Sequence, residues 1–119
     1  MRKGNIIAIL GAGAIGLCTM IAAKQLGATT FMSDPVDFKL NKAKQLGADF
    51  AINPKTQDLS KIVKDLTQNK GVDVAIDCAG APMSLMDCIN LVKKDGTVVV
   101  TALFKKNVKI DSGPSHKRT

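Results

Sequence analysis

Residues 9–16 read ILGAGAIG, in which glycine recurs as Gly11-x-Gly13-x-x-Gly16. This spacing is typical of a loop that holds the pyrophosphate of a dinucleotide. In such a loop Gly11 would make the tight turn off a strand, Gly13 would let the backbone approach the phosphates, and Gly16 would let a helix pack close to the sheet. The three glycines alone are a weak signal, so the residues around them decide their meaning.

The residues on either side of the glycines fit a strand–loop–helix unit. The short apolar run Asn5–Leu10 predicts a strand covered on both faces, and Ala14–Leu26 predicts a helix that is apolar nearly all round and therefore packed into the protein. The N–H groups at the start of this helix would face phosphate. No Gly-Lys-Ser/Thr follows the glycines and Lys24 lies too far along the helix, which excludes a mononucleotide P-loop.

The rest of the chain continues the alternation of strand and helix. The hexapeptide AKQLGA occurs at residues 23–28 and 43–48, each time where a helix ends at glycine and a strand begins. Met83 and Met86 are predicted to be core residues. The further predicted strands are Thr29–Ser33, Phe50–Asn53, Val72–Ile76, Thr97–Ala102 and Val108–Ile110, and the further predicted helices are Asp37–Leu46, Gln57–Gln68 and Met83–Val92.

This order predicts the α/β class, with a doubly wound parallel sheet (a Rossmann fold) of five to six strands. The last strand is the one that the chain could lack. We expect one dinucleotide-binding domain over residues 1–111 and a disordered tail over residues 112–119. A closed eight-fold barrel would need about twice this length.

An acidic residue stands where a dinucleotide site needs one. Asp34 lies 23 positions after Gly11 and 18 after Gly16, at the end of the second predicted strand. A carboxylate there would accept both hydroxyls of the adenosine ribose and would repel a 2′-phosphate, which favours NAD(H) over NADP(H). The same aspartate, followed by Pro35 at the first helical position, would also serve as an ordinary helix cap, and the two roles are compatible.

The turn after the fourth predicted strand is a third candidate element. It reads Asp77-Cys78-Ala79-Gly80-Ala81-Pro82, and ligands of doubly wound sheets bind beyond the carboxyl ends of the strands. An ordinary strand-to-helix turn, with Pro82 at the first helical position, would look the same. The predicted cofactor-binding residues are Gly11, Gly13, Ala14, Ile15, Gly16, Asp34, Lys39, Cys78, Ala79, Gly80, Thr101, Ala102 and Leu103.

These stretches, together with KGNIIAILGAGAIGL, SDPVDFKLNKAKQLGAD, AINP, GVDVAIDCAG and DGTVVVTALF, resemble the coenzyme domain of the zinc-dependent medium-chain alcohol and polyol dehydrogenases over residues 3 to about 111. The resemblance implies NAD as cofactor, pyrophosphate on the glycine loop and ribose on Asp34. A family arginine near the adenosine is Lys39 here, which stacks on adenine less well. The intact enzyme would transfer hydride between an alcohol and NAD.

The catalytic groups of that family are absent from this chain. Its zinc site lies in a separate domain, whereas the chain has one histidine (His116), no glutamate and three scattered cysteines. No catalytic residue or metal ligand is therefore predicted here, and the chain alone is expected to be inactive. The absence of tyrosine also argues against a short-chain dehydrogenase, and the loop spacing against a methyltransferase. A stand-alone module that senses NAD(H) or an adenosine ligand remains the alternative.

Composition narrows the expected partners. Of the net charge of +7, residues 105–119 carry +4 (five basic residues against Asp111), and aromatic residues make up 3% of the chain, so nucleic-acid binding is not expected. No membrane span or signal peptide is evident, and three cysteines form no framework of pairs; the expected location is cytoplasmic. The expected partners are NAD(H), the catalytic domain of the intact enzyme and, if the fifth strand is an exposed edge, a second copy of the chain.

Overall fold

Apolar residues alternate between the two faces of the central strand, β1 (Ile6–Leu10), in the computed structural model, which describes residues 4–101. Ile7 and Ile9 join a core cluster on one face, whereas Ala8 and Leu10 join a second cluster on the other. Because the strand buries both faces, it reads as a continuous apolar run.

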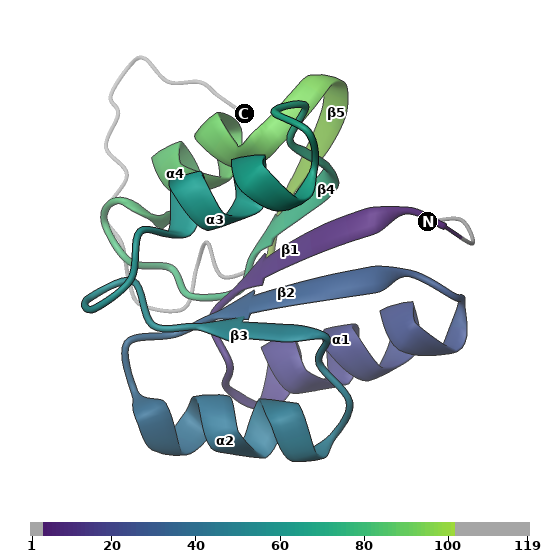
Figure 1. Ribbon diagram of the computed structural model, residues 1–119. Coiled ribbons are helices and arrows are strands. Elements are labelled where there is room, and N and C mark those ends of the chain that lie inside the picture. The colour runs from purple at the N-terminus through teal and green to yellow at the C-terminus, as the bar shows by residue number, and fades with distance from the viewer. Residues whose placement is uncertain (1–3, 102–119) are drawn as a thin grey trace, which may run out of the picture.

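All five strands pair in parallel in one sheet, in the order β3-β2-β1-β4-β5. Helices α1 and α2 cover one face and α3 and α4 cover the other (Figure 1). The other elements are α1 (Ala14–Gln25), β2 (Thr29–Ser33), α2 (Asp37–Gln45), β3 (Phe50–Ile52), α3 (Leu59–Leu66), β4 (Val72–Asp77), α4 (Ser84–Leu91) and β5 (Val92–Val100). The predicted doubly wound sheet is confirmed. After β3 the chain crosses back over the sheet, and β4 pairs with the free side of β1.

The repeated hexapeptide forms the same helix end twice. Gly27 and Gly47 follow α1 and α2 with φ of +89° and +113°. In both copies the second alanine donates its N–H to the carbonyl of the first, over 3.0 Å, as in a Schellman motif. Each copy therefore stops a helix and sends the chain into the next strand.

The fifth strand begins earlier than predicted and is irregular. Val92 pairs with Val72, but the next pair is Thr97 with Val74, so residues between them bulge out of register. Asp95, in the predicted Lys-Asp-Gly turn, has φ of +69°. The turn signal was therefore right about the backbone, but it lies inside a strand rather than before one.

Several packing predictions are wrong. Met83 and Met86 are 62% and 50% exposed rather than core residues. Helix α1 buries one face and leaves Ile15 60% exposed, although its sequence is apolar nearly all round. Pro35 and Pro82 each precede the helix cap instead of taking the first helical position.

Three predictions lie outside the described residues: the strand Val108–Ile110, the tail 112–119 and the site residues Ala102 and Leu103. Within residues 4–101 no helix is long and apolar enough to cross a membrane.

Candidate functional site

The glycine loop leaves β1 at the end of the sheet where the parallel strands finish, here called the carboxyl end of the sheet. Gly11 has φ of +109°, and a Cβ at this residue would lie 2.8 Å from the amide nitrogen of Ala79 in the turn after β4. Its N–H donates to the carbonyl of Ser33, at the end of β2. Gly11 is thus required by the close approach of a neighbouring turn as well as by its own conformation.

Gly13 and Gly16 are glycines for different reasons. A Cβ on Gly16 would lie 1.8 Å from the carbonyl oxygen of Gly11. The sequence predicts that Gly16 lets the helix pack against the sheet, whereas the contact that requires glycine is with the loop itself. A Cβ on Gly13 would meet nothing within 4 Å. Gly13 is exposed and caps α1 without a side-chain hydrogen bond. The open space beside it, at the positive end of a helix, suits an anionic ligand.

Asp34 is 7% exposed and is held by the backbone on two sides. Its Oδ2 accepts the N–H of Ala12, and its Oδ1 accepts the N–H of Val36, both over 2.9 Å. The residue that caps α2 is Val36, with no side-chain cap bond, so Asp34 is not the cap of this helix. A carboxylate offers about four acceptor positions, so two remain for a ligand.

Lys39 is exposed on α2, the helix that follows Asp34. Within residues 4–101 the structure gives Lys39 no hydrogen bond or ion pair with Asp34.

A buried amide that sequence reasoning missed lies beside the Asp34 turn. Asn53, at the end of β3, is 7% exposed, and its Nδ2 donates to the carbonyl of Pro35 (3.3 Å) and to Oδ1 of Asp37 (2.9 Å). Asn53 lies in AINP, one of the stretches that carry the family resemblance. An apolar strand that ends on an amide was the signal that could have drawn attention to Asn53.

The turn after β4 is organised by Asp77, which is 3% exposed. One carboxylate oxygen accepts the N–H groups of Ala79 and Gly80, each over 3.0 Å, and the other accepts the hydroxyl of Ser84 over 2.9 Å. The sequence predicts Asp77 only as the first residue of this turn and does not indicate its hydrogen bonds. Its hydrogen bonds fix the backbone that packs against Gly11.

Cys78 and Thr101 complete the carboxyl end of the sheet. The N–H of Cys78 donates to the carbonyl of Leu10, and Thr101 donates its N–H to the carbonyl of Asp77 (2.9 Å) and its hydroxyl to Sγ of Cys78 (3.3 Å). The glycine loop, the Asp34 turn, the Asp77 turn and Thr101 therefore form one hydrogen-bonded group. Of the predicted site residues, this group brings together Gly11, Asp34, Cys78, Ala79, Gly80 and Thr101. Gly13, Ala14, Ile15 and Gly16 lie in the loop and the first turn of α1, and Lys39 is exposed on α2.

Ion pairs lie at the opposite, amino end of the sheet. Lys24 meets Asp49 at 2.9 Å and Lys93 meets Asp73 at 2.6 Å. Burial would raise the pKa of Asp49, but the N–H of Thr30 and the ammonium of Lys24 outweigh it, and the pKa is lowered. The pKa of Asp73 is likewise lowered, because Lys93 and the N–H of Ile6 outweigh burial. In residues 4–101 neither Asp34 nor Asp77 belongs to an ion pair.

Among residues 4–101 the cysteines and the acids do not assemble a metal site. Within the described part of the chain, no group of three histidine, cysteine, aspartate or glutamate side chains could hold a metal ion. Cys88 is buried, and burial, followed by the nearby charges of Asp77 and Asp87, raises the pKa of its thiol to about 12. These residues do not fit a zinc ion.

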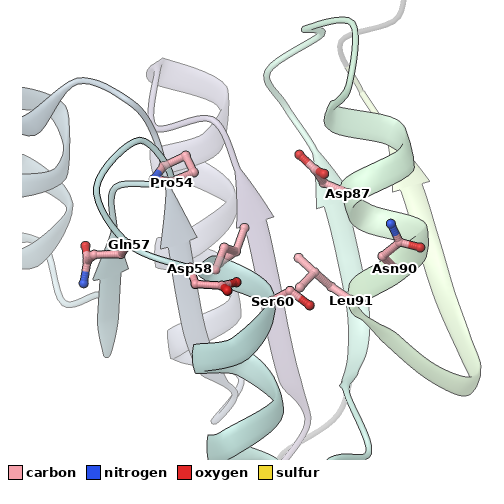
Figure 2. A pocket seen from close by; sticks show the side chains of 8 residues that line it. Pro54, Gln57, Asp58, Ser60, Asp87, Asn90 and Leu91 are labelled. Carbon is pink, nitrogen blue, oxygen red and sulfur yellow. The ribbon is translucent and has the colours of Figure 1, made fainter.

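A cleft of about 420 Å³ lies elsewhere, between α3 and α4 (Figure 2). It is lined by the loop after β3, the first turn of α3 and one flank of α4, and it includes none of the predicted cofactor residues. The predicted site lies instead at the carboxyl end of the sheet, where Gly13, Ala14 and Ile15 are exposed.

Known proteins match the chain over most of its length. The family model of the zinc-binding dehydrogenases matches residues 14–119. The L-threonine 3-dehydrogenase of Pyrococcus furiosus is 40% identical over 109 residues, 91% of this chain and 31% of that protein. The sorbitol dehydrogenase of Bacillus subtilis is 36% identical over 108 residues, 90% of this chain and 31% of that protein.

Solved structures agree with these relatives. The zinc-dependent alcohol dehydrogenase 2 of Streptococcus pneumonia superposes with a TM-score of 0.82 at 32% identity, and the match covers 92% of this chain and 32% of that one. The chain thus spans about a third of the proteins it matches. The matches favour a coenzyme domain over the alternative of a stand-alone sensing module.

Proposed function

The chain belongs to the zinc-binding dehydrogenase family, and from that premise we propose that residues 1–111 bind NAD(H) at the carboxyl end of the sheet. The observation that carries the proposal is the pairing of two features: open space beside Gly13 at the start of α1, and the Asp34 carboxylate bound to the N–H of Ala12 in the same loop. One suits a pyrophosphate and the other suits the neighbouring ribose.

Each predicted residue has a part in this proposal. The pyrophosphate would lie against the backbone of Gly13 and Ala14, and the ribose hydroxyls would donate to the two free acceptor positions of Asp34. Lys39, exposed on α2, would approach the adenosine. The nicotinamide half would lie towards Ile15, whose exposed side chain offers an apolar surface, and towards the turn Cys78–Gly80 and Thr101. Gly11 would hold the loop against the turn after β4, and Gly16 would let α1 approach the carbonyl of Gly11. Ala102 and Leu103, outside the described residues, are proposed contacts of the nicotinamide half from the sequence alone.

NAD supplies hydride transfer when it is bound. The residues of this chain would bind and orient it, and Asp34 would disfavour a 2′-phosphate by charge repulsion. For the intact protein we propose oxidation of an alcohol or polyol, with zinc and substrate held by a catalytic domain beyond residues 4–101. The L-threonine and sorbitol dehydrogenases named above match only this third of their length, so they do not identify the alcohol.

The partners and location are also proposals. The exposed Met83, Leu85, Met86 and Ile89 of α4 and its cap would contact other parts of the intact protein. Strand β5 is the last of the sheet and pairs only with β4 within the described residues, so its free side would allow pairing with a second copy. Light scattering on the chain should then show a dimer that a Val99→Lys substitution weakens; a monomer at all concentrations would exclude it. The unpaired cysteines agree with a cytoplasmic location.

Titration of the chain with NADH and NADPH tests the binding proposal. The chain has neither tryptophan nor tyrosine, so the emission of the bound nicotinamide can be followed directly, without energy transfer from the protein. We expect saturable NADH binding with a lower Kd than for NADPH. No binding at millimolar cofactor, or a preference for NADPH, would contradict the proposal.

A further inference from the structure

The side chain of Asn53 uses its hydrogen-bonding groups on two loops at once. Its Nδ2 donates to the carbonyl of Pro35 and to Oδ1 of Asp37, and its Oδ1 accepts the N–H of Lys55 over 2.9 Å. The backbone N–H of Asn53 donates to Oε1 of Gln57 over 2.9 Å. A side chain that must donate at one end and accept at the other is an amide rather than a carboxylate.

The two partners of Nδ2 flank the residue that holds Asp34. Val36, between Pro35 and Asp37, donates its N–H to Oδ1 of Asp34 over 2.9 Å. The backbone N–H of Asp34 itself donates to the carbonyl of Ile52, the residue before Asn53, over 3.3 Å. The end of β3 thus contacts the Asp34 turn twice, through the side chain of Asn53 and through the carbonyl of Ile52.

We propose that Asn53 is a positioning residue for cofactor selection: by holding Pro35 and Asp37, it fixes where Asp34 presents its free oxygen positions, and so sets the preference for NAD(H) over NADP(H). The inference rests on the proposed function. Asn53 need not touch the cofactor, because its effect passes through the turn. A turn released from Asn53 would let the Asp34 carboxylate swing, which weakens its hydrogen bonds to ribose and its repulsion of a 2′-phosphate together.

The substitution Asn53→Asp replaces the amide donor with a second acceptor oxygen. The new carboxylate would keep the acceptor for Lys55 but would face the carbonyl of Pro35 and the carboxylate of Asp37 without a proton to donate. Exchanging the pair, as Asn53→Asp with Asp37→Asn, restores one donor and one acceptor across the contact with residue 37 but leaves the carboxylate facing the carbonyl of Pro35. Asp37 is exposed, and Asp37→Ala removes one of the two bonds, which leaves one N–H of the Asn53 amide without its acceptor.

The experiment measures the Kd of NADH and of NADPH by calorimetry on the whole chain and these variants, with melting temperatures alongside. The matched control is Asn90→Ala, an exposed asparagine on α4. We expect Asn53→Ala to lower the NADH-over-NADPH preference about tenfold and Asn53→Asp to lower it further, since one lost hydrogen bond to a charged group corresponds to about tenfold. The exchanged pair should recover part of the preference that Asn53→Asp loses, and Asn90→Ala should show the wild-type preference.

The outcomes separate the two proposals. If the Asn53 variants bind NADH and NADPH with the wild-type ratio, or if both affinities fall in parallel with the melting temperature, Asn53 only supports the fold and the inference is wrong. If Asn53→Ala does not fold, Asp37→Ala decides: it removes the same bond to a charged group, so a loss of preference of up to about tenfold is expected, and an unchanged ratio would overturn the inference. A wild-type chain that binds no NADH would instead refute the proposed function itself.

Discussion

The two ends of this sheet hold their carboxylates in different ways. At the amino end Asp49 and Asp73 each meet a lysine, and both have lowered pKa values. At the carboxyl end Asp34 and Asp77 are buried more deeply, yet within residues 4–101 they are held by backbone N–H groups and a serine hydroxyl, without a cation.

The difference follows from what each end has to do. One lysine pair joins the end of α1 to Asp49, before β3, the other joins β5 to β4, and both neutralise their acids. N–H groups orient a carboxylate while leaving its charge unneutralised, so the acid can still attract hydroxyl groups and repel phosphate. Charge pairing therefore marks the structural end of the sheet, and orientation by N–H groups marks the end proposed to bind.

The largest expected effect separates folding from binding within the glycine loop. Gly16→Ala forces its Cβ onto the Gly11 carbonyl and should cost about 3 kcal/mol of unfolding free energy or more, with loss of NADH binding. Gly13→Ala, where the space is open, should change stability by about 1 kcal/mol or less but still weaken NADH binding. Urea unfolding and NADH titration of both variants measure this. Equal losses of stability would contradict the assignment of the open space to a ligand.

The next effect tests Asp77, an acid at the carboxyl end of the sheet that has no ion-pair partner within residues 4–101. Asp77→Ala leaves the N–H groups of Ala79 and Gly80 and the hydroxyl of Ser84 without their acceptor and should cost about 2–3 kcal/mol. Asp77→Asn keeps an acceptor oxygen for the two N–H groups and should cost less. The loss should hardly change between low and high salt, since no ion pair is broken. Denaturant unfolding at two salt concentrations checks this, and a strongly salt-dependent loss would undo the contrast between the two ends.

The amino end should respond to pH and salt instead, by a smaller amount. Because the folded-state pKa values of Asp49 and Asp73 are lowered, their stabilisation is fully present above the ordinary carboxyl pKa of 3.8 and is lost as the pH falls through the lowered values. Lys93→Met should cost about 0.5 kcal/mol at pH 7, after screening by solvent, and almost nothing at strongly acid pH.

Unfolding curves of Lys93→Met across this pH range measure the effect. The control is Lys61→Met, whose partner Asp65 is well exposed, so a smaller change is expected. A cost for Lys93→Met that persists in acid would mean that its packing, not its charge, matters.

The smallest effect is a reactivity and not a stability change. With its pKa raised to about 12, Cys88 should resist iodoacetamide at neutral pH while the exposed Cys18 reacts, as mass spectrometry of the folded chain would show. Asp77→Asn removes one of the charges that raise this pKa and should speed the labelling of Cys88 modestly. Rapid labelling of Cys88 in the wild-type chain would show that the region around α4 opens more readily than the burial of Cys88 implies.

Much of the fold was predictable from local patterns. Strand β2 was predicted to the residue, and most other boundaries within about two residues, because Gly27 and Gly47 stop their helices by local chemistry that the repeated hexapeptide records. The start of β5 was missed, because a bulge places turn residues inside a strand and only pairing with β4 reveals it.

The partners of the site residues were less predictable. The positions of Gly11, Gly13, Gly16 and Asp34 follow from spacing, but the bond from Asp34 to Ala12 joins residues 22 apart in the chain and requires the strands to be paired first. Asn53 carries no spacing signal of its own. Met83 and Met86 were misjudged for a related reason: helical spacing says that residues share a face, but not whether that face is covered.

The approach of Gly11 to the turn at Ala79 has a consequence for the energetics of any ligand. Gly11 donates its N–H to Ser33 at the end of β2, and the backbone of Ala79 leaves no room for a Cβ beside it, so the backbones that follow β1, β2 and β4 pack directly on one another. The conformational entropy of ordering them is then lost when the chain folds and not again when a cofactor arrives. A molecule as long as a dinucleotide would meet a surface already shaped along its length, so its affinity would be limited by its own flexibility more than by that of the protein.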